Sequence, residues 1–77
     1  MSTAVGFLLD GNLLRHLRRG ARLTQGQMAY RVGCSTVHYR AVEAGRSKAS
    51  ETLVCNLADT FNVPAASLLA PPTKENQ

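Results

Sequence analysis

The segment from Thr24 to Gly45 constrains the fold more than any other part of the chain. Thr24 followed by Gln27 three residues later is typical of a capping box at a helix start, and Gly33 is placed to end that helix after about two turns. Ser35 can cap a second helix at once, and Gly45 can end it. The spacing therefore predicts two short helices joined by a very tight turn.

The apolar residues of this segment leave one side of the second helix free. Ala29 lies where the two helices approach most closely, and Gly33 supplies the positive φ that the turn requires. Tyr39 and Val42 are three residues apart and both face inward, so the opposite side of their helix faces outward. Each feature is common by itself, but their joint spacing before the basic loop 46–48 indicates a helix-turn-helix.

The rest of the chain predicts further helices and no strand. Asp10 or Asn12 can cap a helix that ends near Gly20, with Leu13 and Leu17 on its apolar face. Residues 1–9 are apolar without a clear period. They are consistent with a docked arm, a short strand at a dimer interface or a leading helical turn.

Two more helices follow the basic loop. Ser50 caps a helix that Asn62 ends in a left-handed conformation, and Pro64 begins a last short helix that ends near Leu69. The sequence thus predicts an all-α fold, with a five-helix domain over residues 10–70. Residues 1–9 would precede it as an apolar arm, and residues 71–77 would follow as a polar tail or the start of a linker.

Charge is distributed unevenly along the chain. Residues 1–50 hold eight basic and two acidic residues, a formal charge of +6, whereas residues 51–77 hold one basic and three acidic residues, or −2. This pattern suggests one surface for a polyanion and another for packing or self-association. Charge alone does not distinguish this interpretation from ordinary solvated arginines.

Several classes of function are disfavoured. Seventy-seven residues form one domain or a fragment of one, too small for a deep enzyme cleft. No apolar run approaches the roughly 18 residues of a membrane span, and residues 1–9 lack the features of a secretion signal, so we expect a cytoplasmic protein. Cys34 and Cys55 do not have metal-site spacing with His16 and His38, and we expect buried, inert thiols and no metal.

The stretches LTQGQMAYRVGCSTVHYRAVEAGRSK, residues 23–48, and NLADTFNVPAASLL, residues 56–69, resemble the lambda-repressor-like family, the Cro/C1 or XRE type of helix-turn-helix regulators. The resemblance covers residues 13–69. It implies a five-helix domain whose third helix enters the major groove of double-stranded DNA. Such domains usually bind a palindromic operator as a two-fold dimer.

The resemblance also implies roles for individual residues. Those that face the bases are Thr36, Val37, Arg40 and Ala41. Those that contact phosphates are Gln25, Ala44, Arg46, Ser47 and Lys48. Arg18 and Glu43 form a structural ion pair that ties the first helix to the end of the third.

The chemistry of the base-facing residues fits these roles unequally. Arg40 can bind guanine O6 and N7 through two hydrogen bonds, worth about 1–3 kcal/mol of discrimination. Thr36 and Val37 offer methyl groups that suit a thymine methyl. Ala41 and Ala44 permit close approach rather than specify a base. Part of the specificity is therefore expected from DNA shape or from the N-terminal arm.

Three positions depart from the family pattern. Arg22 stands where a glycine often closes the turn before the second helix, which puts the angle of the first helix in doubt. Tyr39 occupies a position that is usually aliphatic, and its hydroxyl must find water or a partner at the domain edge. Gly26 weakens the first turn of its helix.

The favoured function is a sequence-specific transcription regulator, most simply a repressor, that needs neither catalysis nor a cofactor. One alternative is an antitoxin or another protein-interaction module of the same fold. Another is the DNA-binding fragment of a longer regulator that continues past Gln77. We expect a homodimer that associates through Val63–Leu69 or Val5–Leu9, and favour the former because it is not basic.

Overall fold

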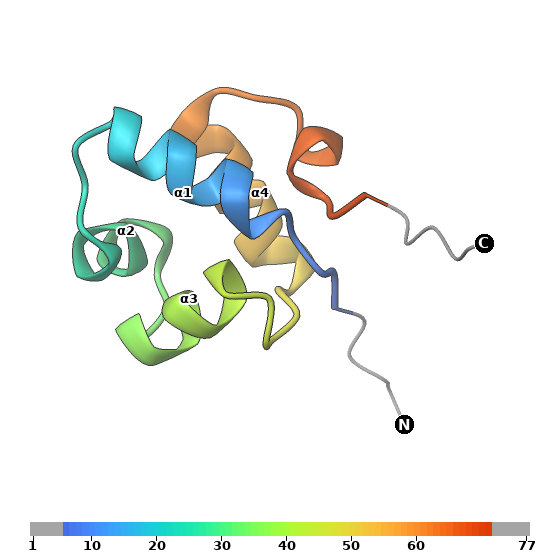
Figure 1. The fold of residues 1–77 in the computed structure, drawn as a ribbon, viewed down its shortest axis with the longest axis horizontal. Helices are drawn as coiled ribbons and strands as arrows, with labels where there is room; N and C mark the ends of the chain where they lie inside the picture. Colours follow the sequence, from blue (N-terminus) through green and yellow to red (C-terminus); the bar gives the residue numbers. More distant parts are fainter. Residues whose placement is uncertain (1–5, 72–77) are drawn as a thin grey trace.

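Four α-helices and one 3-10 turn follow one another in the computed structural model, which describes residues 6–71 (Figure 1). The elements are α1 (Gly11–Gly20), α2 (Gln25–Val32), α3 (Thr36–Glu43), α4 (Glu51–Phe61) and the 3-10 turn η1 (Ala65–Leu68). The predicted all-α class is confirmed. The last of the five predicted helices is the single turn η1, because the backbone on either side of Leu69 is hydrogen-bonded to the N-terminal arm instead of continuing a helix.

The helix boundaries follow the capping residues. Asp10 accepts from Leu13 N–H at the start of α1, and Thr24 and Gln27 form a complete capping box at the start of α2. Ser35 and Ser50 cap α3 and α4 through their hydroxyls. These bonds satisfy backbone N–H groups that have no partner inside the helix.

Left-handed residues end two of the helices. Gly33 closes α2 with a φ of 82°, as the turn requires, and Asn62 closes α4 with a φ of 56°. The α1 helix ends at Gly20 as predicted, and Arg22 just beyond it has a φ of 62°. The arginine thus adopts the left-handed conformation that a glycine would take without steric cost.

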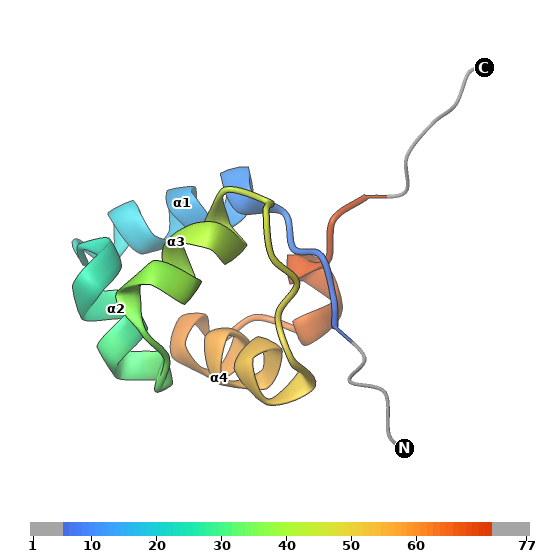
Figure 2. The same ribbon diagram turned by 90° about the horizontal axis from the view of Figure 1, so that it is seen from below.

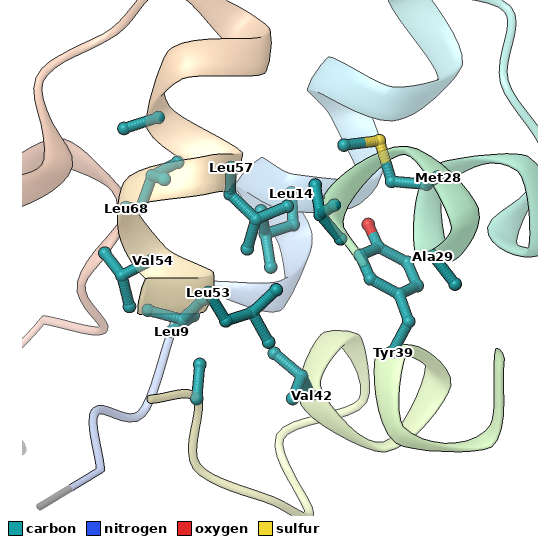
Figure 3. Packing of buried hydrophobic residues seen from close by; sticks show 13 residues of the cluster. Leu9, Leu14, Met28, Ala29, Tyr39, Val42, Leu53, Val54, Leu57 and Leu68 are labelled. Atoms are coloured by element: carbon teal, nitrogen blue, oxygen red, sulfur yellow. The ribbon is translucent and has the colours of Figure 1, made fainter. Parts of the chain in front are cut away.

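One hydrophobic core joins all the elements (Figure 3). Its largest fully buried side chains come from all four helices and η1: Leu14, Met28, Tyr39, Val42, Leu57 and Leu68. Ala29 is also buried, where α2 packs against α3. The core therefore fixes which side of α3 points inward.

The N-terminal arm docks on its own domain. Phe7 exchanges two backbone hydrogen bonds of 2.8 Å with Ala49, and Leu9 forms an antiparallel bridge with Leu69. Leu9 is only 3% exposed and belongs to the core. Of the three interpretations left open by the sequence, residues 6–9 adopt the docked arm, while residues 1–5 lie outside the described part.

The cysteines differ from expectation. Both were expected to be buried, but Cys55 is exposed, because the inward face of α4 is formed by Leu53, Val54, Leu57 and Ala58 and Cys55 falls outside it. Cys34 is half-buried, and burial raises the pKa of its thiol. Between residues 6 and 71, no cluster of three histidine, cysteine or acidic side chains is placed to hold a metal. In the same range, no helix is long and apolar enough to cross a membrane.

Candidate nucleic-acid interface

The α3 helix has sharply different sides. Tyr39 and Val42 are fully buried, whereas Val37, on the other side, is 78% exposed. Thr36 and Arg40 are exposed beside Val37. Three of the four predicted base-facing side chains are therefore open to solvent. The α3 helix that carries them lies at the edge of the fold (Figure 1).

Ala41, the fourth predicted base-facing residue, has a different position. It is half-buried, and its carbonyl accepts from Arg46 N–H at 2.8 Å and Ser47 N–H at 3.3 Å. These bonds fold the chain back against α3 after Gly45, whose φ is 83°. Ala41 therefore shapes the following loop as well as lining the outward side of α3.

The loop after α3 brings most of the predicted phosphate contacts together. Ala44, Arg46 and Lys48 are exposed, and Ser47 is half-buried. The loop is fixed at one end by the two hydrogen bonds to Ala41 and at the other by the pairing of Ala49 with Phe7. A basic loop with a defined backbone thus follows directly on the exposed side of α3.

The predicted Arg18–Glu43 ion pair lies within a larger buried group. Arg18 donates to both carboxylate oxygens of Glu43, from Nε at 2.9 Å and from a terminal nitrogen at 3.1 Å. Tyr39 Oη donates to Glu43 Oε2 and Gln25 Nε2 donates to Oε1, each at 2.8 Å. We call Arg18, Gln25, Tyr39 and Glu43 the carboxylate cluster. Its common acceptor is the Glu43 carboxylate, which thereby joins α1, α2 and α3.

Burial and hydrogen bonding act in opposite directions on Glu43. Burial alone would raise the pKa of its carboxyl group, but the hydrogen bonds from Arg18, Tyr39 and Gln25 outweigh burial and lower that pKa. The hydrogen bond to Glu43 raises the pKa of Arg18, and burial raises that of Tyr39. Arg18 also donates to the Leu23 carbonyl at 2.9 Å. Hydrogen bonds from the surrounding groups thus offset the cost of burying the Arg18–Glu43 ion pair.

Tyr39 and Gln25 have roles in this cluster that the sequence analysis missed. The Tyr39 hydroxyl was expected to find its partner at the domain edge, but its partner is the buried Glu43. The spacing of four residues between them on α3 was the available signal. Gln25 was assigned only to a phosphate. Its side-chain amide donates to Glu43. Because Gln25 is the first residue of α2, a phosphate contact through its backbone N–H stays a prediction.

The two helix starts lie close together. A Cβ added to Gly26 would lie 3.7 Å from Thr36 Oγ1, an ordinary contact distance. The start of α2, with its predicted phosphate contact, therefore adjoins the first predicted base-facing residue of α3. Together with the loop after α3, these elements form one continuous candidate surface for DNA.

Sequence comparison agrees with this arrangement. The family described as "Helix-turn-helix domain" matches residues 11–70. The chain therefore belongs to this family of DNA-binding domains, in its lambda-repressor-like, Cro/C1 type, which is typical of transcription regulators.

A solved structure is similar as well. It is the restriction-modification controller protein C.AhdI from Aeromonas hydrophila, with a TM-score of 0.69 and 27% sequence identity. The similarity covers 77% of this chain and 89% of that one. No curated protein matches the chain.

Proposed function

We propose that the chain is a transcription regulator that represses by occupying a palindromic operator as a homodimer. The observation that carries this proposal is the outward side of α3, where Val37 and Arg40 are exposed opposite the buried Tyr39 and Val42. The likeness to a protein described as a restriction-modification controller supports a regulatory role. Such a regulator would reside with the nucleoid in the cytoplasm and would need no cofactor.

In this proposal α3 enters the major groove. Arg40 binds the O6 and N7 atoms of a guanine, and Thr36 and Val37 pack against thymine methyl groups. Ala41 and Ala44 are small, so the backbone of α3 can approach the bases closely. DNA shape contributes the remaining specificity, because the base-facing side has one long polar side chain.

The loop after α3 supplies affinity without regard to sequence. Arg46 and Lys48 are exposed cations beside the end of α3, and Ser47 adds a hydroxyl. Each cation that neutralises a phosphate releases a counterion, so the binding constant falls as the salt concentration rises. Gln25 joins this phosphate-binding set at the start of α2, where the backbone N–H of the first residue has no partner within the helix.

A dimer follows from the small size of the reading surface. One short helix contacts only a few base pairs, and two copies about 34 Å apart would contact two half-sites. The candidate contact is a mainly apolar groove that also includes one carboxylate; it is lined by Phe7, Glu51, Val54, Cys55, Ala65, Ala66 and Leu69.

This groove unites the two segments that the sequence offered for dimerisation. Leu9 pairs with Leu69, and Ala70 N–H donates to the Leu8 carbonyl at 2.9 Å, so the arm and the C-terminal segment are adjacent. Leu68 is buried within its own domain, whereas Leu69 is 39% exposed. Leu69 is therefore the leucine of the C-terminal segment that a second copy would cover.

The decisive experiment is selection of random duplexes by the purified protein. We expect two inverted half-sites, each with a guanine that depends on Arg40. Arg40→Ala should relax the preference for that guanine by about 1–3 kcal/mol. Arg40→Lys is the matched control for charge, because it retains attraction to phosphates but lacks the planar guanidinium group.

Lys48→Ala tests the other half of the interface. It should weaken binding to all duplexes alike and reduce the slope of affinity against salt by about one per subunit.

If Arg40→Ala leaves the base preference unchanged, the assignment of α3 as the reading helix is wrong. A protein that selects no duplex but co-purifies with a small partner protein would instead be an antitoxin or a similar interaction module.

A further inference from the structure

Gly6, in the N-terminal arm, lies against the stem of Lys48. A Cβ added to Gly6 would lie 2.6 Å from Lys48 Cβ, 3.4 Å from Lys48 Cδ and 3.6 Å from the Ala49 carbonyl oxygen. The first distance is shorter than any normal carbon–carbon contact. Lys48 Cβ is the fixed beginning of its side chain and not a flexible end. A larger residue at position 6 must therefore displace Lys48 or the arm.

The arm is held firmly at this point. Phe7 and Ala49 exchange two backbone hydrogen bonds of 2.8 Å, and Ala49 is fully buried. Figure 2 shows the arm, in blue, running beside the loop that joins α3 to α4. At the other end of the loop, Arg46 N–H donates to the Ala41 carbonyl. The segment that carries Lys48 is thus fixed to α3 on one side and to the arm on the other.

We propose that Gly6 is a positioning residue for DNA binding, which acts by fixing the stem of Lys48. This proposal rests on the proposed function, in which Lys48 binds a phosphate. A free lysine side chain loses rotamer freedom when it binds, and an already restricted stem has less freedom to lose. The absence of a side chain at residue 6 lets the arm approach the Lys48 stem closely enough to restrict it.

The test substitution is Gly6→Ala, and Gly20→Ala is its matched control. A Cβ at Gly20 meets no atom within 4 Å, and Gly20 lies at the end of α1 without a positive φ. Gly6→Ala should lower affinity for every duplex by the same factor. It should also reduce the salt slope by up to about 0.9 per subunit, the value for one lost phosphate contact. Gly20→Ala should change neither quantity.

A double-mutant cycle shows whether Gly6 acts through Lys48. Lys48→Gly removes both the ammonium group and the Cβ that an alanine at position 6 would meet. In the Lys48→Gly background, Gly6→Ala should therefore have no further effect on affinity or on the salt slope. Equal losses in both backgrounds, or no loss in either, would overturn the proposal.

Backbone amide NMR shifts of the free protein test the contact between Gly6 and Lys48 without DNA, and the DNA affinity of Lys48→Gly separates this proposal from the proposed function. Gly6→Ala should shift the NMR signals of Lys48 and Ala49, and Gly20→Ala should not. If Lys48→Gly leaves affinity and salt slope unchanged, Lys48 does not bind a phosphate and the positioning proposal fails. Base preference that still depends on Arg40 in that case would leave the reading role of α3 intact.

Discussion

Arg22 and Glu43 show how single residues set the geometry between helices. Arg22 has a φ of 62° between α1 and α2, where a side chain with a Cβ costs about 1–2 kcal/mol. Its backbone N–H still donates to the Arg19 carbonyl at 3.0 Å, so the turn forms without a glycine. The sequence identified Arg22 as a departure from the family pattern. In the structure the turn forms despite the arginine, and Arg22 adopts the strained left-handed backbone conformation.

Replacing Arg22 by glycine should stabilise the fold. The relief of backbone strain exceeds the extra freedom that glycine gains in the unfolded chain, so the free energy of unfolding should rise by about 0.5–1 kcal/mol. Arg19→Gly removes the same charge from within α1 and should lower that free energy by about 1 kcal/mol. Urea denaturation measures both. A destabilised Arg22→Gly variant would contradict the strain assigned to this position.

Glu43 makes the stability of the fold depend on pH. Because the folded state lowers the pKa of its carboxyl group below the usual 4.5, the ionised form stabilises the fold fully above that value. This contribution is lost as the pH falls through the folded-state pKa. Glu43→Gln should therefore reduce the loss of unfolding free energy on acidification from about pH 5 to pH 3.

The exposed Glu51 on α4 provides the control for this measurement. Glu51→Gln should change the acid dependence of the unfolding free energy less than Glu43→Gln does. If Glu43→Gln loses stability on acidification as steeply as the unchanged chain, the carboxylate cluster does not control acid stability.

At the scale of elements, the sequence predicted what local chemistry determines. The capping box at Thr24 and the caps at Ser35 and Ser50 gave the helix starts, because each is a contact within one helical turn. The docking of the arm depends on backbone hydrogen bonds between residues far apart in the chain. Such bonds leave no pattern of side chains, so neither Phe7–Ala49 nor Leu9–Leu69 was predictable.

Part of the candidate site was likewise predictable from the sequence, and part was not. The outward side of α3 follows from the inward positions of Tyr39 and Val42, and the sequence predicted it. The Arg18–Glu43 pair came from the family resemblance and is present. The bond from Gln25 to Glu43 was not predictable, because it depends on how α2 and α3 cross.

The contact between α1 and α3 allows no side chain at Gly11. A Cβ there would collide with the carbonyl oxygen of Glu43. Gly11→Ala should lower the free energy of unfolding by about 1–3 kcal/mol, because the two helices must separate. Gly20→Ala, at the other end of α1, meets no neighbour and should be neutral or slightly stabilising.

Thermal unfolding of these two alanine variants measures the difference directly. Equal stability of the two would show that α1 and α3 are not in close contact at Gly11. Because Glu43 is also the centre of the carboxylate cluster, Gly11→Ala should shift the NMR signals of the Arg18 guanidinium as well.

At the scale of the whole molecule, the exposed charges and the exposed apolar groove are on different segments. Arg40, Arg46 and Lys48 lie on α3 and the following loop, whereas Leu69 lies after η1 beside the arm. In the proposed function, the first segment would bind DNA and the groove would bind a second copy.

Leu69→Glu should weaken the proposed dimer without unfolding the domain. Leu69 is 39% exposed, so the charge can remain in water in the monomer but not in a covered interface. The dimer Kd should rise by about tenfold or more. Sedimentation equilibrium without DNA measures it, and Tyr30→Glu, at a side chain 89% exposed on α2, is the control. An unchanged Kd would place the dimer contact elsewhere.

The residues proposed to read bases and those that hold the fold together are almost entirely different sets. Thr36, Val37 and Arg40 are exposed, and Ala41 is half-buried, and none of the four belongs to the core or to the carboxylate cluster. Substituting these four side chains should therefore change the operator that the protein prefers with little loss of stability. A descendant of this chain could acquire a new target gene by a few substitutions along one helix, while its architecture remained intact.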